Sequence, residues 1–151
     1  MKTDDPGRAS SEAAAEIRQI IERRATAVRA GDADAILRDL ADDAVTFDVV
    51  GPLRHAGKAD TRKRIVEWLG SYDDPPTWEN RDVHVVASGP VAFSHALSRV
   101  TGRLKTGANV DMWFRTTLGF ERRAGSWLIV HDHGSDPFDS KSGKASRDLK
   151  P

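Results

Sequence analysis

A single aspartate lies inside an otherwise apolar, β-favouring run, and its surroundings suit proton transfer. Asp48 stands between Phe47 and Val49 in residues 45–50, a run that ends at a Gly-Pro pair. A carboxylate that shares a pocket with apolar side chains can act as a general base. An aspartate beside a turn can instead accept hydrogen bonds from backbone N–H groups. We predict that Asp48 lies in a pocket with Phe47, and the turn role is the alternative.

Further polar side chains in the second half of the chain could join Asp48 in a binding or acid/base site. They are His95, Arg99, Arg115, His131, Asp132 and His133. His95 shares one face of a predicted strand with the bulky Phe93 and with Arg99, whereas alanine and serine occupy the other face. We expect this bulky face to line the pocket. The alternative is a core histidine that is hydrogen-bonded to a backbone carbonyl or a carboxylate.

The faces of the two histidines near the end of the chain depend on the turn before their strand. A two- or four-residue turn at residues 124–125 pairs both histidines with the face of Phe114. A bulged turn pairs them with Arg115 and brings Asp132 into the pocket. Both arrangements stay open, so the candidates here are Phe114, Arg115, His131, Asp132 and His133.

Two histidines separated by one residue also follow a spacing that metal sites use. His131 and His133 would lie on the same side of a strand, and Asp48 could complete a set of ligands. We nevertheless predict no metal and keep this set as an alternative.

The elements that position these residues follow from hydrophobic spacing. Apolar residues at 17, 20, 21 and 28 have helical period, and Gly31 and Asp32 suit the end of one helix and the start of the next. A third helix is expected over about residues 60–69. Strands are expected at residues 45–50, 53–55, 77–88, 91–104, 110–120 and 127–133. This order predicts an α+β fold with three N-terminal helices on a curved, mainly antiparallel sheet that encloses a pocket.

Composition limits the partners. The 23 basic and 23 acidic residues cancel, so we expect neither nucleic acid nor a membrane surface as a partner. The absence of cysteine excludes disulfides, thiolate zinc sites and cysteine nucleophiles. The polar N-terminus and the lack of a long apolar run predict a cytoplasmic protein. Residues 1–10 and 139–151 are expected to be flexible tails around one domain at residues 11–138.

Three stretches resemble a known family. Residues 30–36, AGDADAI, and residues 40–51, LADDAVTFDVVG, resemble the ketosteroid isomerase-like and SnoaL-like polyketide cyclase branch of the NTF2-like superfamily. Residues 125–138, GSWLIVHDHGSDPF, look like the last strand of SnoaL-like proteins. With the order of elements, the resemblance covers residues 12–138 and implies the NTF2-like cone.

The resemblance also implies roles for individual residues. Asp48 matches the position of the isomerases' aspartate base, and Asp132 resembles the acidic residue that SnoaL-like cyclases carry late in the chain. No metal or cofactor is implied. The convex face of the sheet often forms a dimer contact in this superfamily, so we expect a homodimer through that face, where Asp111, Trp113 and Arg115 are predicted to lie.

The chain departs from the isomerases in the groups that stabilise an oxyanion. The family's tyrosine would fall at Arg24 or Ala25, the sole tyrosine is Tyr72, and residues 112–115 lack the second acid. We therefore carry two hypotheses, and both include a small, largely apolar ligand. The first is a cofactor-free isomerase- or cyclase-like enzyme with Asp48 as the base, assisted by His95, His131 or Asp132. The second is a non-catalytic ligand-binding or dimerisation module.

Overall fold

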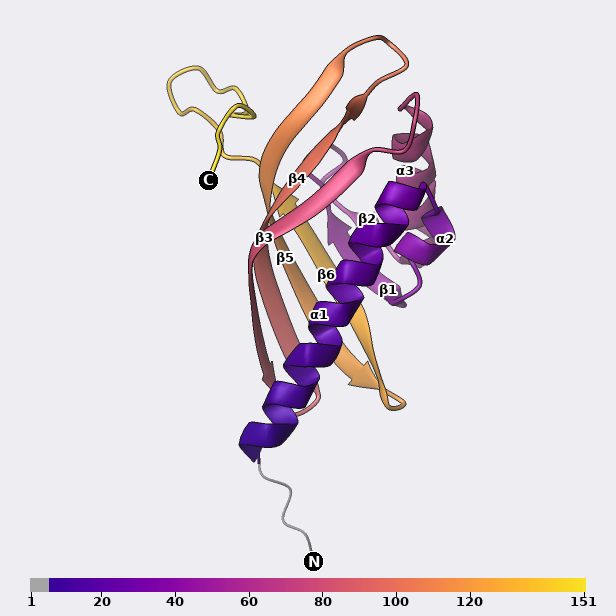
Figure 1. Cartoon of the computed structure of the whole chain (residues 1–151), viewed down its shortest axis with the longest axis vertical. Coiled ribbons are helices and arrows are strands. Elements are labelled where there is room, and N and C mark those ends of the chain that lie inside the picture. The colour runs from indigo at the N-terminus through magenta and orange to yellow at the C-terminus, as the bar shows by residue number, and fades with distance from the viewer. Residues whose placement is uncertain (1–5) are drawn as a thin grey trace, which may run out of the picture.

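The first predicted helix, with apolar residues at 17, 20, 21 and 28, begins before residue 11, where the domain was expected to start. In the computed structural model, which describes residues 6–151, this helix is α1 (Pro6–Ala30), and it lies along the sheet (Figure 1). It buries Ile17 and Ile20 in the core. Proline is favoured at the first helical position, because its missing N–H would have no partner there. Residues 6–10 of the predicted N-terminal tail are thus helical, and residues 1–5 lie outside the described part of the chain.

The expected boundary between the first two helices is confirmed. Gly31 has a φ of +68°, and the Asp32 side chain accepts a hydrogen bond of 3.0 Å from the Ala35 N–H in the first turn of α2 (Ala33–Ile36). The third predicted helix is α3 (Lys58–Gly70). Among the described helices, none is long and apolar enough to cross a membrane.

Six strands form one curved sheet in the order β2-β1-β6-β5-β4-β3. Neighbouring strands are antiparallel except β1 and β6, which are parallel. The predicted hairpin and the four-stranded meander are both present, and the helices gather on one face of the sheet (Figure 1). The fold is α+β as predicted. The strands are β1 (Leu40–Phe47), β2 (His55–Ala56), β3 (Thr77–Ser88), β4 (Val91–Arg103), β5 (Asn109–Arg123) and β6 (Ser126–Ser135).

One extra residue in β6 decides which of its side chains face the helices. Residues 124–125 form a two-residue turn, but the pairing of β5 with β6 then shifts, because Val130 has no partner on β5. A bulge reverses the faces of all residues beyond it. Asp132 therefore lies on the concave face and both neighbouring histidines lie on the convex face. The predicted arrangement with Asp132 in the pocket and both histidines on the face of Arg115 is therefore confirmed. The bulge that causes it lies in the strand and not in the turn.

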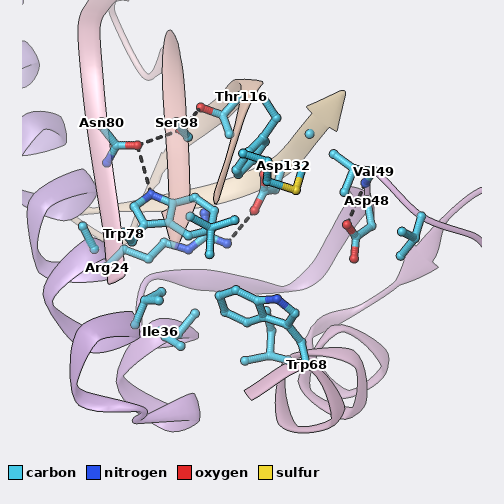
Figure 2. A pocket seen from close by; sticks show the side chains of 18 of the residues that line it. Arg24, Ile36, Asp48, Val49, Trp68, Trp78, Asn80, Ser98, Thr116 and Asp132 are labelled. Atoms are coloured by element: carbon cyan, nitrogen blue, oxygen red, sulfur yellow. Dashed lines mark hydrogen bonds and ion pairs between the residues drawn. The ribbon is translucent and has the colours of Figure 1, made fainter. Parts of the chain in front are cut away.

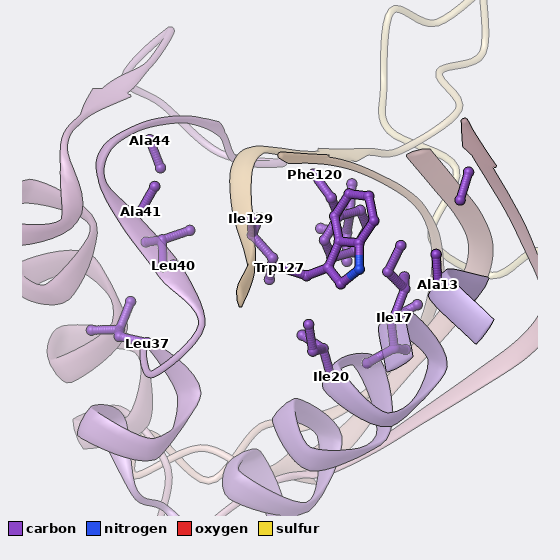
Figure 3. Close-up of a cluster of buried hydrophobic side chains, with 13 residues drawn as sticks. Ala13, Ile17, Ile20, Leu37, Leu40, Ala41, Ala44, Phe120, Trp127 and Ile129 are labelled. Atoms are coloured by element: carbon purple, nitrogen blue, oxygen red, sulfur yellow. The ribbon is translucent and has the colours of Figure 1, made fainter. Parts of the chain in front are cut away.

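The hydrophobic core lies between the N-terminal half of α1 and the ends of β5 and β6 near their turn (Figure 3). Its largest side chains are Ile17, Ile20, Ile21, Leu37, Leu40, Leu118, Phe120, Trp127 and Ile129. The C-terminal half of α1 extends beyond this core, over the part of the sheet that faces α3. Helices and sheet are held apart there, which leaves space for a cavity.

The chain after β6 folds back toward the end of that strand. An isolated bridge joins Phe138 and Ala145, and the Ser146 N–H donates to the Pro137 carbonyl at 2.7 Å. Residues 139–151 contain no helix or named strand. The flexibility expected of this segment stays a prediction.

Candidate functional site

A cavity of about 610 Å³ lies between the concave face of the sheet and the helices (Figure 2). This volume falls within the range of about 300–1,000 Å³ that small-molecule pockets occupy. Residues 21, 24, 25 and 28 of α1 line it, and their spacing of three or four residues puts them on one helical face. Thr61, Arg64, Ile65 and Trp68 line it from α3 with the same spacing.

An arginine from the first helix pairs with an aspartate from the last strand inside this cavity. Figure 2 shows Arg24 extending from α1 to Asp132, and its Nη2 lies 2.5 Å from Oδ2 of the carboxylate. The Arg24 side chain is 19% exposed and that of Asp132 is 15% exposed. Among the described residues, no hydrogen-bond donor reaches Oδ1 of Asp132. One oxygen of this carboxylate is therefore held by the protein and the other is available to a ligand.

Asp48 also lines the cavity, and both of its oxygens have partners. Oδ1 accepts a hydrogen bond of 2.6 Å from the Val49 N–H, and Oδ2 accepts one of 2.6 Å from Nε of Arg64 in α3. Asp48 thus lines the cavity, as predicted, but its hydrogen bonds are not those of the alternative role at the turn. The donor is its immediate neighbour and not the Gly51–Pro52 turn.

A row of polar groups crosses three strands on the cavity wall (Figure 2). The side-chain oxygen of Asn80 accepts from Nε1 of Trp78 at 3.0 Å and from Oγ of Ser98 at 2.8 Å. The Ser98 hydroxyl is also 2.9 Å from that of Thr116. The row therefore links β3, β4 and β5 and orients the side chain of Asn80.

Aromatic side chains form much of the rest of the wall. The ring centroids of Trp68 and Tyr72 are 5.7 Å apart, those of Trp68 and Trp78 are 6.1 Å apart, and those of Trp78 and Phe114 are 5.2 Å apart. All three pairs meet edge to face, an arrangement that favours aromatic contact. Burial raises the pKa of the Tyr72 hydroxyl above its ordinary value. The prediction that Phe114 lines the pocket is confirmed.

The face of β4 that we expected in the pocket lies on the outside. His95 packs against His84 with ring centroids 5.2 Å apart, and Phe93 is 46% exposed. Arg99 pairs with Asp111 at 2.8 Å and holds the pKa of that carboxyl below its usual range. The interior takes the small side chains instead, namely Ser94, Ala96 and Ser98. The bulky face was assigned wrongly because both faces of β4 carry apolar side chains, and only the pairing with β5 decides which one turns inward: Ser94 lies opposite Leu118 and Ser98 opposite Phe114, on the face that lines the cavity.

Three more predicted residues also lie on the convex face. Nδ1 of His131 is 2.8 Å from the Val45 carbonyl oxygen, and Nε of Arg115 donates to Oγ of Ser135 at 3.1 Å. His133 lies beside His131, with ring centroids 6.1 Å apart. The bulge in β6 directs the two histidine side chains away from the cavity, whereas Arg115 on β5 lies on the convex face because its neighbours Phe114 and Thr116 take the concave face. They do not meet Asp48, so the alternative metal set is not assembled.

Phe47 belongs partly to both faces. It is among the residues that line the cavity, but its ring meets those of His131 and His133 edge-on, with ring centroids 4.8 and 5.4 Å apart.

Within residues 6–151, no cluster of three His, Asp or Glu side chains could hold a metal ion.

Sequence reasoning missed two arginines and one amide that line the site. Arg64 and Asn80 were not candidates, and Arg24 was noted only as the residue at the place of a family tyrosine. A signal existed for the two arginines, because each continues the apolar stripe of its helix at a spacing of three or four residues. Asn80 had no such signal, because alternating polar residues are common in strands.

Comparison with known proteins agrees with this architecture. The model of the SnoaL-like domain matches residues 17–139. An NTF2-like protein of unknown function from Pseudomonas putida KT2440 is 36% identical, with a TM-score of 0.86, and the match covers 94% of this chain and 99% of that chain. The chain therefore belongs to the SnoaL-like domain family and has the NTF2-like fold.

More distant structures share the fold alone. A ketosteroid isomerase-like protein from Erwinia carotovora atroseptica SCRI1043 is 22% identical, with a TM-score of 0.71 over 82% of this chain and 95% of that chain. A dehydratase candidate of the NTF2-like family from Streptomyces avermitilis is 14% identical, with a TM-score of 0.70 over 80% and 93%. A search of curated proteins found no match.

Proposed function

We propose that this protein binds a small, largely apolar organic molecule in the cavity and that Asp132 transfers a proton to or from it. The observation that carries the proposal is the Arg24–Asp132 pair, which presents one free carboxylate oxygen to an apolar, aromatic-walled cavity. Arg24 places a cation beside this carboxylate, which offsets part of the cost of burying a charge in such surroundings.

Asp132 is a better candidate for the base than Asp48. Both oxygens of Asp48 already accept hydrogen bonds, from Val49 and from Arg64. A proton that Asp48 takes from a ligand would have to displace one of these donors, whereas Oδ1 of Asp132 has no partner in the described chain. His95 and His131 lie on the convex face and are no longer proposed as catalytic groups. Asp48 is retained as a ligand-binding residue and as the second candidate for the base.

The reaction class that suits these groups is proton abstraction from carbon beside a carbonyl, as in an isomerase or a cyclase. Such a reaction needs a positioned carboxylate, which Asp132 supplies, and a hydrogen-bond donor for the developing oxyanion. The isomerases' tyrosine and second acid have no counterpart at the matching positions, so this donor would have to come from another residue of the cavity wall. Two structural neighbours are described as ketosteroid isomerase-like and as a dehydratase candidate, and these names fit a proton-transfer role.

The experiment uses 2-tetralone, a bicyclic ketone with exchangeable α-protons, in D₂O. We expect the wild-type protein to accelerate deuterium incorporation above the buffer rate, as followed by NMR. Asp132→Asn should remove about a hundredfold or more of the acceleration. Asp34→Asn is the matched control, because that side chain is 79% exposed on the surface. Full activity in Asp132→Asn together with its loss in Asp48→Asn would transfer the role of base to Asp48.

A second candidate function is a non-catalytic binding and dimerisation module. Its support is the convex face, where Val86, Val91 and Phe93 are 41%, 53% and 46% exposed and Val86 pairs with Phe93 across the strands. We propose that a second copy of the chain covers this patch, since exposed apolar patches mark interfaces. Sedimentation equilibrium should give a dimer that Phe93→Glu dissociates, and a wild-type monomer at high micromolar concentration would rule out the dimer.

A further inference from the structure

The hydrogen bonds around Asn80 determine how its amide is oriented. Nε1 of Trp78 can only donate, so the atom that it meets at 3.0 Å must be the amide oxygen. Ser98 donates to the same oxygen at 2.8 Å. The Asn80 oxygen is therefore doubly occupied, and its NH₂ group has no acceptor among the described residues.

The neighbours of Asn80 are themselves held in place. Ser98 is fully buried, and because its proton goes to Asn80, its oxygen is left to accept from the Thr116 hydroxyl at 2.9 Å. Trp78 is packed against Trp68 and Phe114. A donor fixed by such a network loses little freedom when a ligand binds, which is the condition for a strong and selective hydrogen bond.

The charges of the cavity indicate what kind of acceptor this donor would meet. Every charged side chain that lines the described cavity has a partner of opposite sign: Arg24 with Asp132, Arg64 with Asp48, Arg147 with Asp136, and Asp111 with Arg99. An anionic group on a ligand would have to compete for these arginines. A neutral oxygen acceptor needs only the unpaired amide of Asn80.

We propose that Asn80 forms a subsite that anchors a neutral carbonyl oxygen of the ligand through its side-chain NH₂, with Trp78 and Ser98 as positioning residues. The subsite rests on the proposed binding function but not on the proposed chemistry of Asp132. Asn80 lies on β3 and Asp132 on β6, with β4 and β5 between them in the sheet, so the ligand's anchored carbonyl would be separate from its reacting end. The ligand class is then a mostly apolar molecule with an uncharged carbonyl at the Asn80 end.

The test compares two probes that differ only in the carbonyl: 2-acetylnaphthalene and 2-ethylnaphthalene. Asn80→Asp is the informative variant, because a carboxylate oxygen can still accept from Trp78 and Ser98 while the NH₂ donor is lost. We expect Asn80→Asp to weaken the binding of the ketone about tenfold or more and to leave the hydrocarbon within about twofold. Equal losses for both probes, or no loss for the ketone, would overturn the subsite.

A second measurement needs no variant. In the wild-type protein, the side-chain ¹⁵N–¹H resonances of Asn80 should shift when 2-acetylnaphthalene binds and should respond much less to 2-ethylnaphthalene. Identical responses to both probes would also reject the subsite. Failure of the wild-type protein to bind either probe would reject the subsite and the binding function together. Binding of the hydrocarbon without an Asn80-dependent preference for the ketone would reject the subsite alone.

Discussion

The ion pair between Arg24 and Asp132 should couple the first helix to the last strand in the folded state. Arg24→Met removes the cation and leaves a carboxylate in the cavity, and Asp132→Asn removes the anion and leaves a guanidinium there. Losing one partner of a fully buried pair costs about 3–5 kcal/mol, whereas exposed pairs contribute about 0–1 kcal/mol. With side chains that are 19% and 15% exposed, we expect each variant to lose about 2 kcal/mol of unfolding free energy.

The assay is a double-mutant cycle measured by urea denaturation. The double variant should lose about 1–2 kcal/mol less than the sum of the two single losses, because its second substitution removes the group that the first left unpaired. In a thermal scan, each single variant should unfold about 4–8 °C lower, since about 2–4 °C corresponds to 1 kcal/mol for a domain of this size.

A matched surface pair provides the control. Arg62 and Asp34 lie 3.0 Å apart, but their side chains are 52% and 79% exposed. The same cycle on this pair, with Arg62→Met and Asp34→Asn, should give a coupling below about 0.5 kcal/mol. If the cavity pair couples no more strongly than this surface pair, the inference that the Arg24–Asp132 pair stabilises the folded cavity is wrong.

Two further predictions concern the wall of the cavity. Because burial raises the pKa of Tyr72, its hydroxyl ionises at a lower pH in the unfolded chain than in the folded protein, so its contribution to stability should be full below about pH 10 and fall as the pH rises above it. Tyr72→Phe should therefore reduce the fall in melting temperature between about pH 9 and 11. An equal fall in both proteins would contradict this. A Cβ at Gly102 would lie 2.8 Å from two ring atoms of Tyr72, so Gly102→Ala should lose about 1–3 kcal/mol in urea denaturation. Gly70→Ala is the control with open space around it, and it should lose none.

Much of the architecture was predictable from short-range patterns. The apolar spacing of the helices, Gly31 with its positive φ, and Asp32 as the helix cap each depend on neighbours a few residues away. Alternation along the strands and their turns predicted the meander for the same reason. The position of Asp48 in the cavity also followed, since it comes directly after β1, in a stretch whose resemblance to a known family is local and unbroken.

The face of the sheet on which each side chain lies was less predictable. Side chains alternate along a strand, so one extra residue moves all later side chains to the opposite face. Val130 has no partner on β5, and this one bulge places Asp132 in the cavity and His131 outside it. On β4, both faces offered reasonable interiors, and the bulky face with Phe93 and His95 was chosen wrongly.

The sequence by itself therefore determined the elements, their order and the residues available to a site. Only the tertiary structure decided which of these residues meet. Arg24 and Asp132 are 108 positions apart in the chain, and no periodic pattern spans such a distance. Their pairing, like the orientation of Asn80 by Trp78 and Ser98, depends on how the helices pack on the sheet and on the register between strands, which are properties of the whole folded chain.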